Sequence, residues 1–418
     1  MKNNKNFWMY AVGRFISLIG SGIQMVALPL YILDLTGSGT LMGLFSMLTI
    51  VPSLITSPFS GILGDRKNRK YIMILMDCGR GILLCLLSLL VIFKHMNITL
   101  LFTAQVFISI MDSMFNSSSG AIMPELVSSE NLINANSIKG GMDGASMVVG
   151  PLLGGVIYSF GGIKTVFLIN AVSFFVCAIF SSLIKYKKNI SQKEKMSAKV
   201  FVNETSETFT FIKNNKGLMQ LLTFSMIVNF LMVPMLQIIF PFALKKSIGF
   251  SADKYGYIIG FFTIGIVFGN VALAIYFKKL SNKSLMKTGF ISQTIASIIG
   301  CTFLCPKLVS TLGGATTKLF TILIISMFLV GFFNAFINTP ISTNFQKMVP
   351  EHMRSRFFSL QGMLIQAAVP IGSLIYGLLL DRVPYFNIIL TVNLLLAVLV
   401  AYFIVTACDE AYQPAEAV

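Results

Sequence analysis

Long apolar runs follow one another along nearly the whole chain, and each is long enough to cross a lipid bilayer as a helix. The runs lie near 7–33, 40–63, 71–94, 98–122, 137–160, 164–184, 218–244, 255–278, 286–304, 318–342, 358–380 and 386–407. A spanning helix needs about 20 apolar residues because the hydrocarbon core is about 30 Å thick. Barrel strands would be shorter and would alternate apolar with polar residues. The pattern therefore predicts an all-α membrane protein with twelve transmembrane helices.

The composition excludes the other broad classes of protein. Hydrophobic residues make up 55% of the 418 residues and charged residues only 11%, whereas soluble domains contain about 25% charged residues. The net charge of +16 would indicate a nucleic-acid partner only if it formed a basic face on a soluble domain. The basic residues lie instead between the apolar runs. We expect the chain to contact the lipid bilayer and no nucleic acid, and to be a monomer.

The distribution of Lys and Arg predicts how the chain crosses the membrane. Cytoplasmic loops retain an excess of these residues. Most of the 32 basic residues fall in the segments that share a side with both termini. We therefore expect a multi-pass protein of the cell membrane with both termini in the cytoplasm.

One polar segment, 185–217, is longer than every other connection and lies at the middle of the chain. It predicts an N-terminal six-helix bundle (1–184), a cytoplasmic linker (185–217) and a C-terminal six-helix bundle (218–418). The linker is either a solvated tether or, in its second part, an amphipathic helix on the membrane surface.

An internal repeat favours the same division. Met-Pro-Glu at 123–125 matches Val-Pro-Glu at 349–351, and Gly-Gly-Val-Ile-Tyr at 154–158 matches Gly-Ser-Leu-Ile-Tyr at 372–376. The matching helices are six spans apart, which indicates a parallel repeat. Transporters whose halves are related by an axis along the membrane normal have repeats of this kind.

The loop after the second span has a distinctive pattern of charge and small residues. Its key residues are Gly61, Asp65, Arg66, Asn68, Arg69 and Lys70. The loop resembles the signature G-x-x-x-D-R-x-G-R-K of the major facilitator superfamily, with Asn68 in place of the second glycine. Asparagine also tolerates the left-handed conformation that such a turn can require. The resemblance implies a fold of two pseudo-symmetric six-helix bundles and a gating role for the loop, through charge-assisted hydrogen bonds.

A second motif lies in the fifth span and consists of Gly150, Pro151, Gly154 and Gly155. It resembles the G-P-x-x-G-G motif of superfamily members that work as antiporters, and it favours export over uptake. Small residues let helices pack closely, and proline removes one backbone hydrogen bond.

The stretches 112–125 and 135–137 are similar to the macrolide-efflux and enterobactin-exporter branch of drug:proton antiporters. The arginine that the superfamily has in the cytoplasmic part of the fourth helix is missing here, and Asp112 lies in that region. A proton-coupling mechanism therefore cannot be transferred residue by residue.

Charged residues inside membrane spans are costly and often functional. The candidates for proton coupling are Asp112, Asp143, Asp77, Arg80 and Arg14, together with Asp34 at the outer end of the first span. All but Asp34 lie at similar depth near the cytoplasmic ends of their spans, so we expect them to meet in one cluster. Either an acid of this cluster exchanges a proton, or the acids neutralise the two arginines and brace the bundle.

The second half of the chain has amides in its spans and no charge well inside them. Asn229, Gln237, Asn334 and Asn338 are the candidates for contact with a substrate, and bonding between helices is the alternative for each. The 37 Phe and 23 Met suit an adaptable pocket for bulky amphipathic compounds.

Motifs for enzymatic chemistry are absent from the sequence. There is no P-loop, no G-x-S-x-G and no H-E-x-x-H. Cys301 and Cys305 are spaced four apart with no histidine nearby, so we expect neither a metal nor a cofactor. We predict a secondary active transporter that exports an amphipathic, drug-like small molecule in exchange for protons, through alternating access. A metabolite importer or symporter and a lipid transporter or flippase are the alternatives.

Overall fold

The computed structural model describes residues 4–186, 198–277 and 280–414, and these ranges contain helices and no strand. The α-helices are α1 (Lys5–Thr36), α2 (Gly39–Arg66), α3 (Arg69–Ile92), α4 (Ile98–Ile122), α5 (Leu132–Leu183), α6 (Ala198–Asn214), α7 (Lys216–Pro234), α8 (Ala252–Ile275), α9 (Asn282–Phe303), α10 (Pro306–Thr311), α11 (Thr317–Met348), α12 (Arg354–Leu380), α13 (Tyr385–Thr406) and α14 (Asp409–Tyr412). Two π-helical segments, η3 (Met235–Ile239) and η4 (Phe242–Ile248), extend α7, and short 3₁₀ turns η1 (Met123–Glu125), η2 (Ser129–Asn131) and η5 (Glu351–Met353) precede α5 and α12.

Twelve of the helical segments in these ranges are long enough to span a membrane. Ten helices meet the length and hydropathy that spanning requires. One of them, α5, contains a non-helical glycine, Gly162 (φ 66°, ψ −175°), and so supplies two spans. Adding α9, which has 22 residues, gives the twelve segments that the apolar runs predict. The all-α membrane fold class is therefore confirmed.

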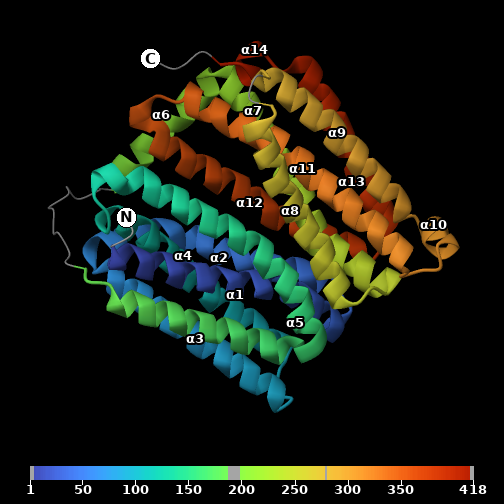
Figure 1. The fold of residues 1–418 in the computed structure, drawn as a ribbon, viewed down its shortest axis with the longest axis horizontal. Helices are drawn as coiled ribbons and strands as arrows, with labels where there is room; N and C mark the ends of the chain where they lie inside the picture. Colours follow the sequence, from blue (N-terminus) through green and yellow to red (C-terminus); the bar gives the residue numbers. More distant parts are fainter. Residues whose placement is uncertain (1–3, 187–197, 278–279, 415–418) are drawn as a thin grey trace. The chain divides into compact units, whose positions relative to one another are not determined.

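The helices form two compact units. The first contains Met1–Asn189 together with Leu244–Gly260, and the second contains Ile190–Ala243 and Phe261–Val418. In the first unit α5 packs along both α1 and α3, and α4 packs against α2 and α3 (Figure 1). In the second unit α12 packs on α7, and α9 packs on α11 and α13. The domain boundaries expected from the sequence stay a prediction.

The pairings in the two units correspond, as the internal repeat predicts. A Cβ added to Gly154 of α5 would lie 2.7 Å from the carbonyl oxygen of Ile23 in α1. A Cβ added to Gly372, the matching glycine of α12, would lie 2.4 Å from the carbonyl oxygen of Phe230 in α7. Each glycine therefore allows close backbone contact, of α5 with α1 in one unit and of α12 with α7 in the other. A larger side chain at either position would have no room.

The segment predicted as a linker is partly helical. Helix α6 occupies 198–214, and Ile212 is buried in the core of the second unit with Leu218 and Leu221 of α7. This part is therefore helical, and it packs on protein through Ile212. A position on the membrane surface stays a prediction. The start of the linker, 187–197, lies outside the described residues.

The C-terminal segment is docked on the second unit. Asn344 of α11 is buried, and its side-chain amide donates hydrogen bonds to the carbonyl oxygens of Ala411 and Tyr412, at 2.8 and 3.0 Å. Lys283 of α9 binds the Asp409 carboxylate at 2.6 Å. The chain end therefore ties together the nearby ends of α9 and α11.

Candidate functional site

Three charged side chains of α3 and α4 form one ion-paired group, which we call the α3–α4 triad: Asp77, Arg80 and Asp112. The Arg80 guanidinium donates to both carboxylates, one through Nη2 and the other through Nη1. Asp77 and Arg80 are adjacent on α3 because residues three apart share a helix face. The rings of Phe115 and Phe174 lie 4.5 and 4.1 Å from the guanidinium carbon, so aromatic faces cover the cation.

The two carboxylates of the triad have different environments. The Asp77 side chain is fully buried, and its Oδ2 makes no hydrogen bond of normal geometry with the described residues, although the weakly donating Cys177 thiol lies close by. The Asp112 side chain is 39% exposed. Two carboxylates share one guanidinium, so the ionised triad has a net charge of −1. Asp112 is the acid that water can reach.

A second ion-paired group lies between α1 and α5. Arg14 donates to both oxygens of Asp143, at 3.1 and 3.3 Å, in the bidentate arrangement that makes such pairs strong. Lys139, one turn before Asp143, approaches the same carboxylate at 3.9 Å. Arg14 also reaches the Ser119 hydroxyl of α4, to which Tyr10 is bonded. With two cations and one acid this group has a net charge of +1.

The five inner charges thus lie in one unit but form two ion-paired groups. Every one of the five has an oppositely charged partner, so bracing is part of the role of each. Asp112 combines partial exposure with a shared cation, and this combination is what distinguishes it. The sequence contained no signal for the aromatic cover over Arg80.

Asp34 lies apart from both groups, at the other end of α1. Its carboxylate accepts a hydrogen bond from the Tyr158 hydroxyl at 2.5 Å and pairs with Lys245, whose ammonium lies 4.9 Å from the centre of the Tyr158 ring. Lys246 donates to the carbonyl oxygen of Gly37 at 2.6 Å. We call these contacts the Asp34 latch. They hold segment 244–260 on the end of α1 and on α5 just before Gly162. Sequence reasoning missed both Tyr158 and Lys245.

The signature loop makes contacts within the first unit. Asn68 has an extended backbone (φ −73°, ψ 114°), and its side chain caps α3 by accepting from the Lys70 amide. Asn68 therefore does not use the left-handed conformation that asparagine tolerates. Arg69 pairs with Glu125, and Lys70 donates to the carbonyl oxygen of Ile184. The side chains of 61–66, including Asp65 and Arg66, lie outside the described residues.

The glycines of the fifth span permit three close approaches. A Cβ on Gly150 would lie 2.8 Å from Cα of Gly22 in α1, and a Cβ on Gly154 would lie 2.7 Å from the carbonyl oxygen of Ile23, the next residue of the same helix. A Cβ on Gly155 would lie 2.5 Å from the carbonyl oxygen of Ala252, at the start of α8. The motif thus packs one helix against both α1 and α8.

The four amide candidates differ in their hydrogen bonds. Asn229 donates to the carbonyl oxygen of Ser225 on its own helix, and Gln237 lies half-buried in η3. Asn338 donates to the side-chain oxygen of Asn334 at 2.7 Å. Among the four, a described hydrogen bond joins only Asn334 and Asn338 to each other.

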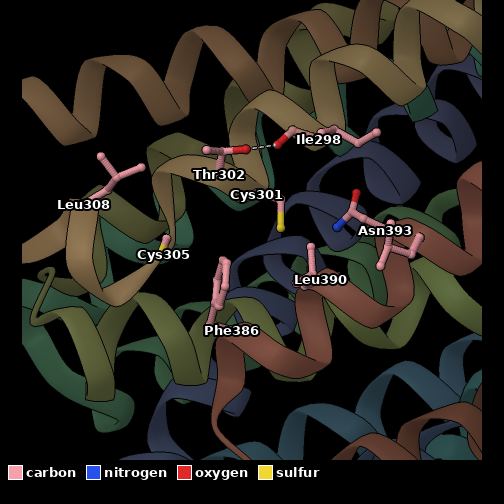
Figure 2. Close-up of a pocket in the computed structure, with 9 residues that line it drawn as sticks. Ile298, Cys301, Thr302, Cys305, Leu308, Phe386, Leu390 and Asn393 are labelled. Atoms are coloured by element: carbon pink, nitrogen blue, oxygen red, sulfur yellow. Dashed lines mark hydrogen bonds between the residues drawn. The ribbon is translucent and has the colours of Figure 1, made fainter.

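A separate cavity of about 200 Å³ lies beside α9, α10 and α13 and is almost wholly apolar (Figure 2). Its lining includes Cys301, Cys305, Thr302, Phe386 and Leu390. The Thr302 hydroxyl donates to the carbonyl oxygen of Ile298, and both cysteines are free thiols. The cavity therefore contains no charged group that could take part in ion coupling.

Comparison with known families identifies the fold. The model of the Major Facilitator Superfamily matches residues 10–306 and 222–416. The chain belongs to the major facilitator superfamily. Its members are transporters, so the expectation of a multi-pass transporter rather than an enzyme is confirmed.

Relatives named for efflux align with much of the chain. Macrolide efflux protein A of Streptococcus pyogenes is 22% identical over 383 residues, which is 91% of both chains. Multidrug efflux pump Tap of Mycolicibacterium fortuitum is 22% identical over 370 residues, 87% of this chain and 86% of the relative. Multidrug resistance protein MdtG of Klebsiella pneumoniae is 26% identical over 234 residues, 54% of this chain and 53% of the relative.

Solved structures of similar fold include transporters with different named substrates. The nucleoside transporter NupG has a TM-score of 0.72 at 15% identity and covers 96% of this chain and 98% of its own. A bacterial homologue of the iron transporter ferroportin, in an inward-facing state, has a TM-score of 0.70 at 16% identity, with coverage of 96% and 98%. At these identities the likeness establishes the fold alone.

Proposed function

We propose that the protein is a secondary active exporter of amphipathic, drug-like small molecules that works by proton antiport in the cell membrane, with both termini cytoplasmic. The names of the macrolide and multidrug efflux relatives support export. The fifth-span glycine motif supports antiport. The observation on which the coupling proposal depends is the half-exposed Asp112, which shares one guanidinium with buried Asp77.

The charge of the triad explains how Asp112 would couple proton movement to a change of conformation. A net negative charge can stay near water but is costly to enclose at membrane depth. Protonation of Asp112 neutralises the triad, and the buried pair of Arg80 and Asp77 remains. The neutral triad can then be enclosed, so proton binding favours the conformation in which Asp112 is shielded. Loss of the proton on the other side reverses this preference.

Efflux from vesicles tests the proposal. Everted vesicles that contain the protein should accumulate macrolides, tetracyclines or dyes when the interior is acidified, and should lose them when a protonophore collapses the gradient. Asp112→Asn keeps the size of the side chain and removes the titratable proton, so gradient-driven accumulation should fall at least about tenfold. Glu130→Gln, an acid-to-amide change at an exposed site, is the control and should keep full activity.

Other outcomes point to the alternative functions. Accumulation that is independent of the gradient, or full activity of the Asp112→Asn variant, would contradict the antiport mechanism. Movement of a labelled nutrient in the opposite direction would indicate an importer. Movement of labelled lipid between liposome leaflets, with no drug transport, would indicate a flippase.

A further inference from the structure

A row of uncharged polar side chains lies exposed along the contact between α8 and α11 in the second unit. We call it the amide row, and its members are Asn270, Asn334, Asn338 and Thr339. The Thr339 hydroxyl donates to Asn270 Oδ1 at 2.7 Å, and Asn338 Nδ2 donates to both oxygens of Asn334. Asn270, Asn338 and Thr339 are exposed, and Asn334 is half-buried.

The depth of the row shows what surrounds it. Helix α11 has 32 residues, which is about 48 Å at a rise of 1.5 Å per residue and exceeds the hydrocarbon thickness by about 18 Å. Asn338 and Asn334 lie ten and fourteen residues before its last residue, Met348, or about 15 and 21 Å. With the excess divided between the two ends, both amides lie at hydrocarbon depth. Exposed amides at that depth are tolerated only where they line a water-filled space.

Two polar groups of the row have no partner among the described residues. Asn338 donates twice, which leaves its side-chain oxygen as an open acceptor, and the Asn334 side-chain nitrogen remains an open donor. The two residues are one helical turn apart and so share a face. A solute hydroxyl can accept from the donor and donate to the acceptor, whereas a group without such atoms would leave both unsatisfied.

The surroundings of the row are apolar and uncharged. Phe332 packs edge to face on Phe333, with ring centres 5.3 Å apart, and tilted on Phe336 at 5.4 Å. No Asp, Glu, Lys or Arg occurs between residues 255 and 277 or between 319 and 346. Unlike an acidic site, the row therefore offers no counter-ion to a charged solute.

We infer that the amide row binds the uncharged, hydroxyl- and carbonyl-bearing face of the transported molecule, and so selects oxygen-rich solutes over apolar cations. This inference rests on the proposed transport function and adds its substrate class. Asn270 and Thr339 join the site through the hydrogen bond between them. Asn229 has its described hydrogen bond with Ser225, outside the row, and does not join it.

Equilibrium binding to the purified full chain in detergent tests the inference without any gradient. The probes are a labelled 14-membered macrolide aglycone, an uncharged polyhydroxy lactone, and tetraphenylphosphonium, an apolar cation without hydrogen-bonding groups. The aglycone should bind more tightly. Asn338→Leu should weaken aglycone binding about tenfold, because the variant loses a hydrogen bond to the bound solute, and should leave binding of the cation unchanged. Gln346→Leu, an exposed amide two turns further along α11, should bind the aglycone normally.

A second variant protects the test against misfolding. Asn338→Asp introduces a counter-ion, so this variant should bind the cation more tightly than the unmodified chain does. Tighter binding of the cation by the unmodified chain, or unchanged aglycone binding by Asn338→Leu, would overturn the inference. Because no gradient is present, the binding result does not depend on whether transport is coupled to protons. A negative binding result would likewise not contradict proton coupling.

Discussion

At the residue scale, Arg80 determines the state of the α3–α4 triad. It is the cation that both acids share, and it lies between two aromatic rings in the interior of the first unit. A buried ion pair adds little net stability compared with a well-packed apolar core, but removal of one partner leaves the others uncompensated.

We therefore expect different results from substitution of Arg80 and of Asp112. Arg80→Ala leaves two acids without their cation and should destabilise the protein by about 3–5 kcal/mol. Asp112→Asn keeps the pair of Arg80 with Asp77 and should change the unfolding temperature little. Thermal unfolding of the purified variants measures both. Equal destabilisation by the two substitutions would show that Asp112 is a bracing residue only.

The sequence was most informative at this scale. Charge inside an apolar run is conspicuous, so all members of both ion-paired groups except Lys139 were predicted as candidates. The pairing of Asp77 with Arg80 follows from their spacing of three residues on one helix. Partners on other helices were not predictable, because which side chains meet there depends on helix rotation and tilt. The same limit applied to Tyr158 and Lys245, which are ordinary residues in the sequence and gain significance only through contact with Asp34.

At the element scale, the Asp34 latch fastens segment 244–260 to the first unit. Residues on either side of this segment belong to the second unit. The segment is therefore continuous in sequence with the second unit, whereas side-chain contacts hold it on the first. The latch must therefore break if η4 separates from the end of α1 during transport.

Exchange of the two charges tests the latch. In a cysteine-free chain, Ser159→Cys would report opening, because the Ser159 hydroxyl lies 3.4 Å from Asp253 in the same contact. Asp34→Lys and Lys245→Asp each place like charges together and should speed labelling by a membrane-impermeant maleimide several-fold. The double exchange restores the pair and should restore slow labelling. Equally fast labelling of the double variant would rule out this ion pair as the fastening.

The docked C-terminal segment is a second element whose stability depends on charge. The hydrogen bond and positive charge of Lys283 lower the pKa of Asp409 from its ordinary value. A lowered pKa in the folded state stabilises the fold above the ordinary pKa, and this contribution is lost as the pH falls through the lowered value. Unfolding midpoints of the unmodified chain and Asp409→Asn should therefore differ at pH 7 and converge once the pH has fallen through the lowered pKa of Asp409. A difference that does not depend on pH would show that Lys283 does not stabilise the docked segment through charge.

The transmembrane helices, their number and their order were predictable from the lengths of the apolar runs alone. Their junctions were not. The fifth and sixth spans are joined through Gly162 without a loop, and the seventh ends in two π-helical segments, features that run length does not encode. Asn68 shows the same limit, since its cap depends on where α3 begins.

At the scale of the whole molecule, the two units differ in charge although their helices pair alike. The first unit contains the ion-paired groups, and the spans of the second contain amides and aromatic rings. We propose that the first unit exchanges protons and that the second recognises the solute. The internal repeat explains why the same helix contacts, such as those of Gly154 and Gly372, support both roles.

Proton antiport couples the flow of solute to an opposite flow of protons. The most direct measurement therefore uses a solute gradient to drive protons. Proteoliposomes that contain the purified protein and a pH-sensitive dye are loaded with a transported macrolide and diluted into macrolide-free buffer, with no initial pH gradient. Outward flow of the macrolide should drive protons inward and acidify the lumen. Liposomes with Asp112→Asn should show no acidification. Macrolide efflux without any change in luminal pH, or acidification of equal size with Asp112→Asn, would contradict the account.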